Sequence, residues 1–176
     1  MRIKAILAGL IVCSLHMAAM AAGHLPLSPG TLNQMDLALQ TLGENLYTTD
    51  LSVRETRFNK LYKEIKSLRT QNAEHHRLRF LEGFYWYQYA LLKERLGANA
   101  LDIWEYRTRE VEPYLDRSAD FFKPLLKSEQ LHYADRARAH YYYAETLQDY
   151  KPEEARFSYK TACKLRHQKA CKRVKP

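Results

Sequence analysis

Histidines are the most chemically versatile residues of this 176-residue chain, and five of them follow its amino-terminal stretch. They are His75, His76, His132, His140 and His167. Neighbouring residues on a helix point about 100° apart, so His75 and His76 cannot readily share one metal ion. His132 and His140 stand two helical turns apart, and no His-Glu-x-x-His motif occurs. The histidines therefore predict no metal site.

The acidic residues offer no stronger catalytic signature. Glu74, Glu82 and Glu94 can be drawn as the paired carboxylates of a sugar hydrolase, but acids are frequent on the solvated faces of helices. The sequence holds neither a nucleophile elbow nor a glycine-rich phosphate loop. We therefore expect a protein that is not an enzyme and that uses no cofactor.

The first segment of the chain has the pattern of a targeting signal. Arg2 and Lys4 precede an uncharged stretch over residues 5–22, which has a compact apolar block and ends in small residues. That order is typical of a secretory signal peptide, and the block is shorter than the ~20 apolar residues of a membrane-spanning helix. We expect residues 1–22 to be cleaved, and residues 23–176 to form one periplasmic or secreted domain without a transmembrane segment.

Two cysteines, Cys163 and Cys171, remain when Cys13 leaves with the signal peptide. Their spacing would separate them by about 12 Å along one continuous helix, whereas a disulfide needs Cα atoms within about 7 Å. Either the helix breaks and folds back between them, or they do not pair. An oxidising compartment favours pairing, so we predict a Cys163–Cys171 disulfide with a turn between the two residues.

The net charge of +8 is concentrated near the end of the chain. The stretch 156–175 contains no acid, and its cations include a basic tail of Lys164, Arg166, Lys169, Lys172, Arg173 and Lys175. Because the body at 23–154 is not basic and the chain is expected to be exported, a nucleic-acid partner is not predicted. The tail fits an anionic surface or a cell-wall polymer. The alternative is that its cations only complement the dipoles of the last helices.

The first half of the predicted domain has the periodicity of amphipathic helices. Ser28-Pro29 predicts a helix start, and Ser52 with Glu55 predicts a capping box that opens a second helix. A short connection through 48–50 would make the two an antiparallel hairpin. Residues 73–96 are apolar or aromatic almost all round, which is typical of a helix buried on several sides.

Prolines and glycines place the other helix boundaries. Gly83 permits a close helix–helix approach, and Gly97 predicts a helix end. Pro113 and Pro124 interrupt the helical stretch over 101–127, and we expect a kink or break near Glu112. Further helices are predicted over 129–149, from 152 onwards and over 168–174. The fold class is all-α, with about six to eight helices in stacked antiparallel hairpins or an irregular bundle.

Aromatic residues cluster within these helices. One interpretation is that they fill the gaps between helices. The other is that consecutive aromatics cannot all face inward, so some line a concave groove and anchor a partner. The candidate partner-binding residues are Tyr85, Trp86, Tyr87, Tyr89, Trp104, Tyr141, Tyr142 and Tyr143.

Small and aromatic residues recur at the end of the chain at the spacing of a helix–turn–helix repeat. Ala144 and Pro152 precede a Tyr-x-x-Ala-Cys motif at 159–163, and Ala-Cys follows at 170–171. Over residues 133–174 the chain resembles the Sel-like α/α repeats related to tetratricopeptide repeats. The resemblance implies helical hairpins that mediate protein–protein contact.

These features predict a non-catalytic exported protein that binds a protein partner. It would serve as an adaptor, or as the immunity or inhibitor protein of an exported toxin or hydrolase. The alternative is a peptidoglycan- or carbohydrate-binding protein of the cell envelope that uses the aromatic cluster. The sequence does not decide between these partners.

Overall fold

Helices make up every regular element that the structure describes. The computed structural model describes residues 27–44 and 50–174. In chain order the elements are α2 (Pro29–Glu44), α3 (Leu51–Gln71), α4 (His76–Leu96), α5 (Ile103–Glu110), α6 (Glu112–Phe122), the 3₁₀ helix η1 (Lys123–Lys127), α7 (Tyr133–Leu147), α8 (Pro152–Lys164) and α9 (Gln168–Arg173). The predicted all-α fold class is confirmed.

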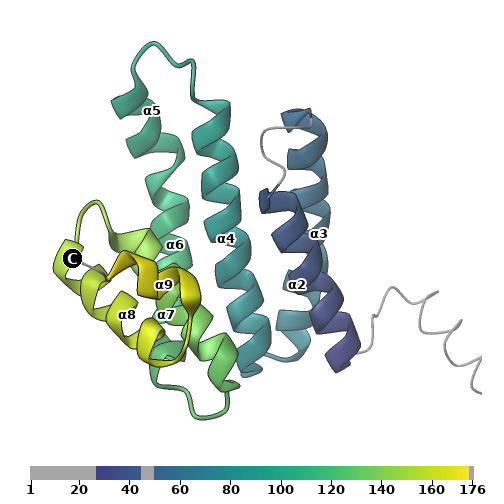
Figure 1. Ribbon diagram of the computed structural model, residues 1–176. Helices are drawn as coiled ribbons and strands as arrows, with labels where there is room; N and C mark the ends of the chain where they lie inside the picture. The colour runs from purple at the N-terminus through teal and green to yellow at the C-terminus, as the bar shows by residue number, and fades with distance from the viewer. Residues whose placement is uncertain (1–26, 45–49, 175–176) are drawn as a thin grey trace, which may run out of the picture.

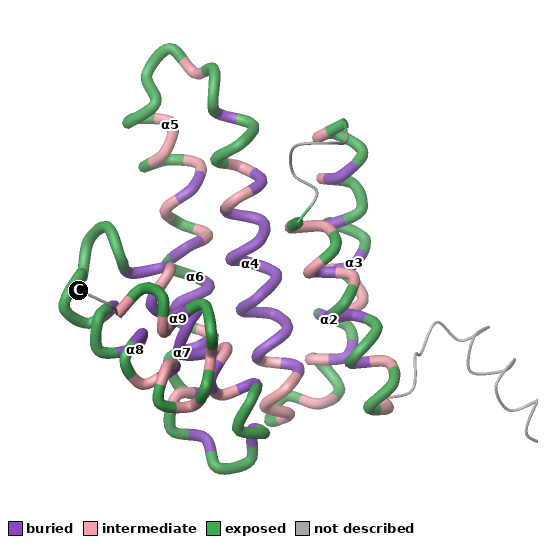
Figure 2. The backbone as a smooth tube through the Cα atoms, viewed as in Figure 1, coloured by how far each residue is buried: buried purple, intermediate pink, exposed green. Residues whose placement is uncertain are grey.

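Helix α4 lies at the centre, between the α2–α3 pair and the α6–α7 pair (Figure 1). Every residue from Phe80 to Ala90 is buried, so almost the whole middle of α4 is enclosed (Figure 2). This confirms the burial on several sides predicted for 73–96, although the helix begins at His76. One connected cluster of buried side chains runs from Leu32 on α2 to Ala170 on α9.

Gly83 is the point where α6 packs against α4. A Cβ atom added to Gly83 would lie 3.0 Å from the Cβ of Phe121 and 3.1 Å from the ring of Phe122. The Ser118 hydroxyl donates a hydrogen bond of 2.8 Å to the Gly83 carbonyl. The close helix approach predicted from this glycine is therefore present, and a buried polar contact accompanies it.

The helical stretch predicted over 101–127 divides where its prolines stand. Helix α5 ends at Glu110 and α6 begins at Glu112, with Pro113 in the first turn of α6. Pro124 similarly occupies the first turn of η1. A proline lacks the N–H group that would continue the preceding helix. The break near Glu112 is confirmed, and it separates α5 from the helix that packs on α4.

Helix α9 folds back on α8 through a tight turn. Arg166 takes a left-handed conformation with φ of 67°. The Arg166 and His167 N–H groups donate to the carbonyls of Cys163 and Ala162, at 2.8 and 3.0 Å, which is the pattern of a Schellman motif. The turn places the Cys163 and Cys171 Cα atoms 4.6 Å apart, at disulfide-bonding distance. The predicted cysteine pair and the turn between its members are confirmed.

The start of α3 differs from the sequence prediction, whereas the end of α4 agrees with it. The cap of α3 is Asp50, whose carboxylate accepts from the Ser52 N–H at 2.8 Å. The predicted Ser52–Glu55 capping box is therefore wrong, because Glu55 instead accepts from Tyr89 and Lys93 of α4. Helix α4 does end beside Gly97, where a Cβ atom would collide with the ring of Tyr106.

Some predictions fall outside the described residues. They are the signal peptide at 1–22, the α2–α3 connection at 48–49 and Lys175. Among the residues that are described, no helix combines the length and the apolarity that crossing a bilayer requires.

A buried ion pair joins α2 to α7. The Arg138 guanidinium donates to both carboxylate oxygens of Asp36, at 2.5 and 2.7 Å. Burial alone would raise the pKa of Asp36, but hydrogen bonds from Arg138 and Gln40, together with the charges of Arg138 and Arg77, hold that pKa below its ordinary value. The same guanidinium lies 4.7 Å from the centre of the Phe80 ring. The ion pair therefore covers part of the apolar core around α4.

We predict opposite effects for alanine at two helical glycines. Gly83→Ala should lower the free energy of unfolding by about 1–2 kcal/mol, because overpacking against α6 outweighs the gain in helix propensity. Gly30→Ala, whose added Cβ has its nearest neighbour at 3.6 Å, should raise it by about 0.5 kcal/mol. Urea denaturation measures both. Equal stabilisation by the two substitutions would contradict the close contact at Gly83.

Removing one partner of the buried ion pair should be more damaging than removing both. We expect Asp36→Ala to lower the free energy of unfolding by about 3 kcal/mol, because it leaves the buried Arg138 charge with only the longer contact to Asp135 at 3.5 Å. The double variant Asp36→Leu with Arg138→Met should recover most of that loss. Thermal unfolding of the single and double variants tests this, and an additive double variant would show that the two side chains are not coupled.

Candidate functional site

Most of the predicted partner-binding aromatics lie in the core. Tyr85, Trp86, Tyr87 and Tyr89 are 1–9% exposed, so the α4 cluster offers no surface to a partner. The prediction that these side chains line a groove is wrong for this cluster. Its physical reason is that α4 has neighbours on several sides, which leaves no solvent-facing stripe for the consecutive aromatics.

The aromatic run on α7 is enclosed in the same way. Tyr141 and Tyr143 are buried and Tyr142 is half-buried, with the Tyr142 ring centroid 4.6 Å from that of Phe84. The Tyr143 hydroxyl donates to Glu154 at 2.5 Å. Burial, followed by this hydrogen bond, raises the pKa of Tyr143 above its ordinary value. The α7 tyrosines thus fill the gaps between helices, and their prediction as partner contacts is also wrong.

Trp104 is the exception among the eight predicted residues. It is 75% exposed on α5, a helix without buried residues. Ile103 is 62% exposed, and Leu101 in the preceding loop is fully exposed. We call Leu101, Ile103 and Trp104 the α5 tip. It lies at the upper end of the molecule, where the α4–α5 loop extends beyond the other helices (Figure 1).

Polar contacts hold the α5 tip in place although its apolar side chains are free of the core. The Asp102 carboxylate caps α5 by accepting from the Glu105 N–H at 2.8 Å. The Tyr106 hydroxyl donates to the Lys93 carbonyl at 3.0 Å, and Arg107 pairs with Glu94 at 3.1 Å. The tip is therefore a defined apolar projection, of the kind that anchors a protein interface.

A second apolar feature is a groove between α2 and α3. It has a volume of about 520 Å³, and its apolar lining is Leu37, Ala38, Leu42 and Leu61. Leu37 is 65% exposed. The polar lining includes Arg57 and Lys60, both exposed, and the half-buried Glu64. We call this feature the α2–α3 groove. Sequence reasoning missed it because Leu37 lies outside the stripe of residues that face α4.

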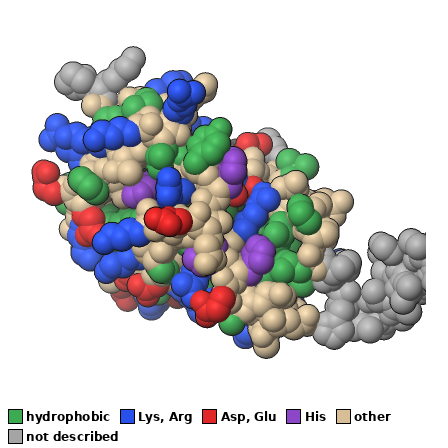
Figure 3. Space-filling model, turned by 90° about the horizontal axis from the view of Figure 1, so that it is seen from below, with side chains coloured by type: hydrophobic (Ala, Val, Ile, Leu, Met, Phe, Trp, Pro, Cys, Tyr) green, Lys and Arg blue, Asp and Glu red, His purple; other side chains and the backbone are tan. Residues whose placement is uncertain are grey.

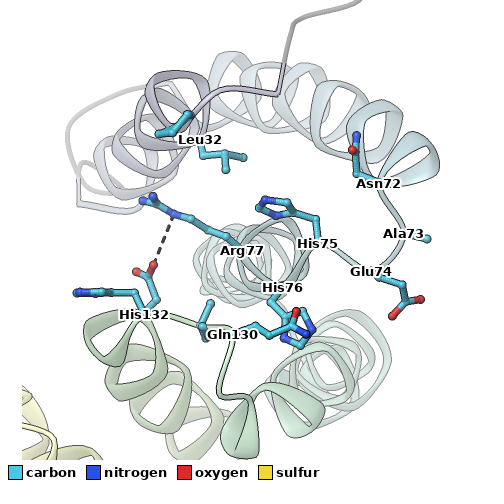
Figure 4. Close-up of a pocket in the computed structure, with 12 residues that line it drawn as sticks. Leu32, Asn72, Ala73, Glu74, His75, His76, Arg77, Gln130 and His132 are labelled. Carbon is cyan, nitrogen blue, oxygen red and sulfur yellow. Dashed lines mark ion pairs between the residues drawn. The ribbon is translucent and has the colours of Figure 1, made fainter.

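An open cavity of about 750 Å³, which we call the lower cavity, lies at the end of the bundle where α2, α4 and α7 begin. His75, His76 and His132 all line it, although they come from segments far apart in the sequence. Figure 4 shows Arg77 reaching across it toward a carboxylate of α7, which belongs to Asp135 at 3.5 Å. Figure 3, which views the molecule from this lower end, shows histidine side chains at several places on the surface.

The groups around this cavity are engaged with one another. His75 and His132 cap α4 and α7 by accepting backbone N–H groups at 3.3 and 3.4 Å. His76 lies 2.5 Å from the Ser128 hydroxyl, but Ser128 is buried and also accepts from the Leu131 N–H. Within the described ranges, no three His, Cys, Asp or Glu residues are placed to hold a metal ion.

The carboxylates weighed as a hydrolytic pair are not brought together. Glu82 and Glu94 lie on α4, about 18 Å apart along its axis. Glu82 pairs with Arg69 at 3.3 Å and Glu94 with Arg107, whereas Glu74 points out of the lower cavity (Figure 4). Each acid thus has a separate environment, and no paired-carboxylate site is formed from these three residues.

The basic tail forms an exposed cationic face on α8 and α9. Lys164, Arg166, Lys169, Lys172 and Arg173 are exposed, and Figure 3 shows Lys and Arg side chains gathered on the left of the lower face. Arg173 pairs with Glu145 at 3.3 Å. Arg156, Lys160 and Lys164 recur every four residues along α8, which places them on one face of that helix.

Comparison with known proteins gives no family to which these surfaces belong. No protein-family model, no curated protein and no solved structure matches the chain. The function is therefore inferred from the side chains and their geometry.

Because histidine side chains cap helices in this fold, we predict that the free energy of unfolding falls in acid. Burial holds the pKa of His75 and of His167 below the ordinary value of 6.5, and both rings cap helices through an unprotonated Nδ1. Above pH 6.5 both rings are neutral in the folded and unfolded chains. Below it the unfolded chain takes up protons first, so the stability that these caps supply is lost as the pH falls toward their folded pKa values.

The measurement is the urea midpoint as a function of pH between 7.5 and 4.5, a range chosen to span the histidine titration. The variant His75→Asn with His167→Asn keeps the caps without the titration, so its midpoint should fall less steeply below pH 6.5. Identical pH profiles for the two proteins would show that these rings do not cause the acid loss.

Proposed function

We propose that this chain is an exported, non-catalytic helical module that binds a protein partner through the α5 tip. The observation that carries the proposal is the exposure of Leu101, Ile103 and Trp104 together at the end of a projecting loop and helix. Burying a large apolar side chain yields about 1.5–3 kcal/mol, and tryptophan is frequent among the residues that dominate interface energies. A convex tip of this composition fits an apolar pocket on another protein.

Two features support the exported setting and the binding role. A cysteine pair at disulfide distance is compatible with an oxidising compartment. The α7–α8 hairpin buries Ala144, Ala155 and Ala162 where the helices meet, as the resemblance to Sel-like repeats implies. Within this proposal the chain acts as an adaptor, or as the immunity or inhibitor protein of an exported toxin or hydrolase.

The second candidate is a protein that binds an anionic cell-wall polymer through its cationic face. The exposed cations of α8 and α9 favour it, because a field of one sign attracts a polyanion. A carbohydrate-binding version of this candidate loses support, since the α4 aromatics that would stack on sugar rings are buried. The protein-binding proposal ranks first because the α5 tip has no role within the described fold.

The partner proposal is tested by crosslinking from the tip. A photoreactive amino acid at position 103 should capture one protein from periplasmic extract, and Trp104→Ser should reduce its yield about tenfold, the equivalent of ~1.4 kcal/mol. The matched control is position 157, because Phe157 is similarly exposed, at 70%, but lies on α8. A photoreactive amino acid at position 157 should not capture this protein, and Phe157→Ser should leave the capture from position 103 unchanged.

Two outcomes would contradict the proposal. One is equal capture from positions 103 and 157, which would mean that the tip has no specific partner. The other is the absence of tip-dependent capture together with retention on purified cell wall that is lost in Lys160→Glu with Lys164→Glu. That result would favour the polymer-binding candidate.

A further inference from the structure

Each copy of the chain carries two apolar features that the described fold leaves uncovered. The α5 tip is convex and presents Leu101, Ile103 and Trp104, all exposed. The α2–α3 groove is concave and presents the exposed Leu37 beside Ala38, Leu42 and Leu61. Its volume of about 520 Å³ lies within the range of about 300–1,000 Å³ that is usual for ligand pockets. The groove therefore has room for large side chains from the tip.

The charges around the two features are opposite in sign. Asp102 and Glu105 flank the apolar residues of the tip and are exposed, and Glu105 also pairs with Arg109 on the same helix at 3.5 Å. Arg57 and Lys60 line the groove and are exposed, whereas its single acid, Glu64, is half-buried. Among the lining residues of the groove the cations thus outnumber the acid. A tip entering the groove would bring unlike charges together at its rim, which favours the encounter and fixes its orientation.

One chain cannot make this contact with itself. The α2–α3 pair and α5 lie on opposite sides of α4 (Figure 1), and α5 contacts α4 and α6. The tip and the groove of one copy therefore remain available at the same time. Contact between different surfaces of two copies is heterologous, so it either closes into a ring or reciprocal pair, or continues into a longer assembly.

We propose that the α5 tip of one copy docks into the α2–α3 groove of a second copy, with Asp102 and Glu105 facing Arg57 and Lys60. This inference rests on the proposed function, because it names a second copy of the chain as a protein that the tip binds. Trp104 and Ile103 supply the apolar contact with Leu37 and Leu61. Pairing of tip with tip would bring acids together, and pairing of groove with groove would bring cations together, so repulsion between like charges disfavours both.

Sedimentation velocity of the full oxidised chain tests the contact. The wild type should show species larger than the monomer that grow with protein concentration. Trp104→Ser in the tip and Leu37→Glu in the groove should each weaken association at least about tenfold, whereas Phe157→Ser should not change it. Thermal unfolding checks that each variant is folded, and because all these side chains are exposed, we expect unfolding temperatures close to the wild type.

Charge reversal makes the test specific to the two surfaces. One variant carries Asp102→Asn, which keeps the cap of α5, with Glu105→Lys, and the other carries Arg57→Glu with Lys60→Glu. Each alone should be monomeric, because like charges then meet at the rim. An equimolar mixture should associate again, because each tip then meets a groove of opposite charge.

The outcomes separate this inference from the proposed function. A wild type that is monomeric up to its solubility limit overturns the docking of two copies, while tip-dependent capture of a different protein would leave the proposed function standing. Association that survives Leu37→Glu overturns the groove as the docking site. Association that is lost with either variant, and restored in the charge-reversed mixture, establishes the contact.

Discussion

The ion pair between Asp36 and Arg138 sets how the two sides of the molecule meet around α4. Its partners lie on α2 and α7, far apart in the chain, and the two-point contact fixes both the distance and the orientation between these helices. Arg138 also covers the rings of Phe80 and Phe84. The charged group thus forms part of the apolar enclosure of α4. The first residues of α2, α4 and α7 line the lower cavity.

Much of this architecture is predictable from local patterns. The enclosure of α4 follows from aromatics on every face, the break before α6 follows from Pro113, and the α8–α9 turn follows from the spacing of Cys163 and Cys171. These predictions succeed because each depends on residues that are neighbours along the chain. The Asp36–Arg138 pair escapes prediction because no local pattern distinguishes these two charged residues from those on solvated faces. The cap at Asp50 is missed because Ser52 offers an equally good local signal.

The candidate binding surfaces are harder to predict for a related reason. Trp86 and Trp104 both stand in aromatic helical segments, yet one is enclosed and the other projects into solvent. The difference arises at Val111, where α5 ends and α6 turns its apolar face to α4. Because the chain changes direction there, α5 is no longer part of the stripe that packs on the core. Pro113 marks the break in the sequence. The direction of α5, which precedes this break, depends on contacts that the sequence does not reveal, such as those of Tyr106 with Lys93 and Gly97.

The tyrosines of the core also hydrogen-bond carboxylates of α7 and α8. Glu145 accepts from the Tyr159 hydroxyl at 2.8 Å and from Tyr87 at 3.4 Å, and Glu154 accepts from Tyr143. Glu145 also pairs with the exposed Arg173 of α9 at 3.3 Å. The same hydrogen bonds satisfy the hydroxyls, which would otherwise be costly to bury. Core packing and the docking of α9 therefore meet at Glu145, because this one carboxylate accepts from buried phenols and pairs with an exposed cation of the last helix.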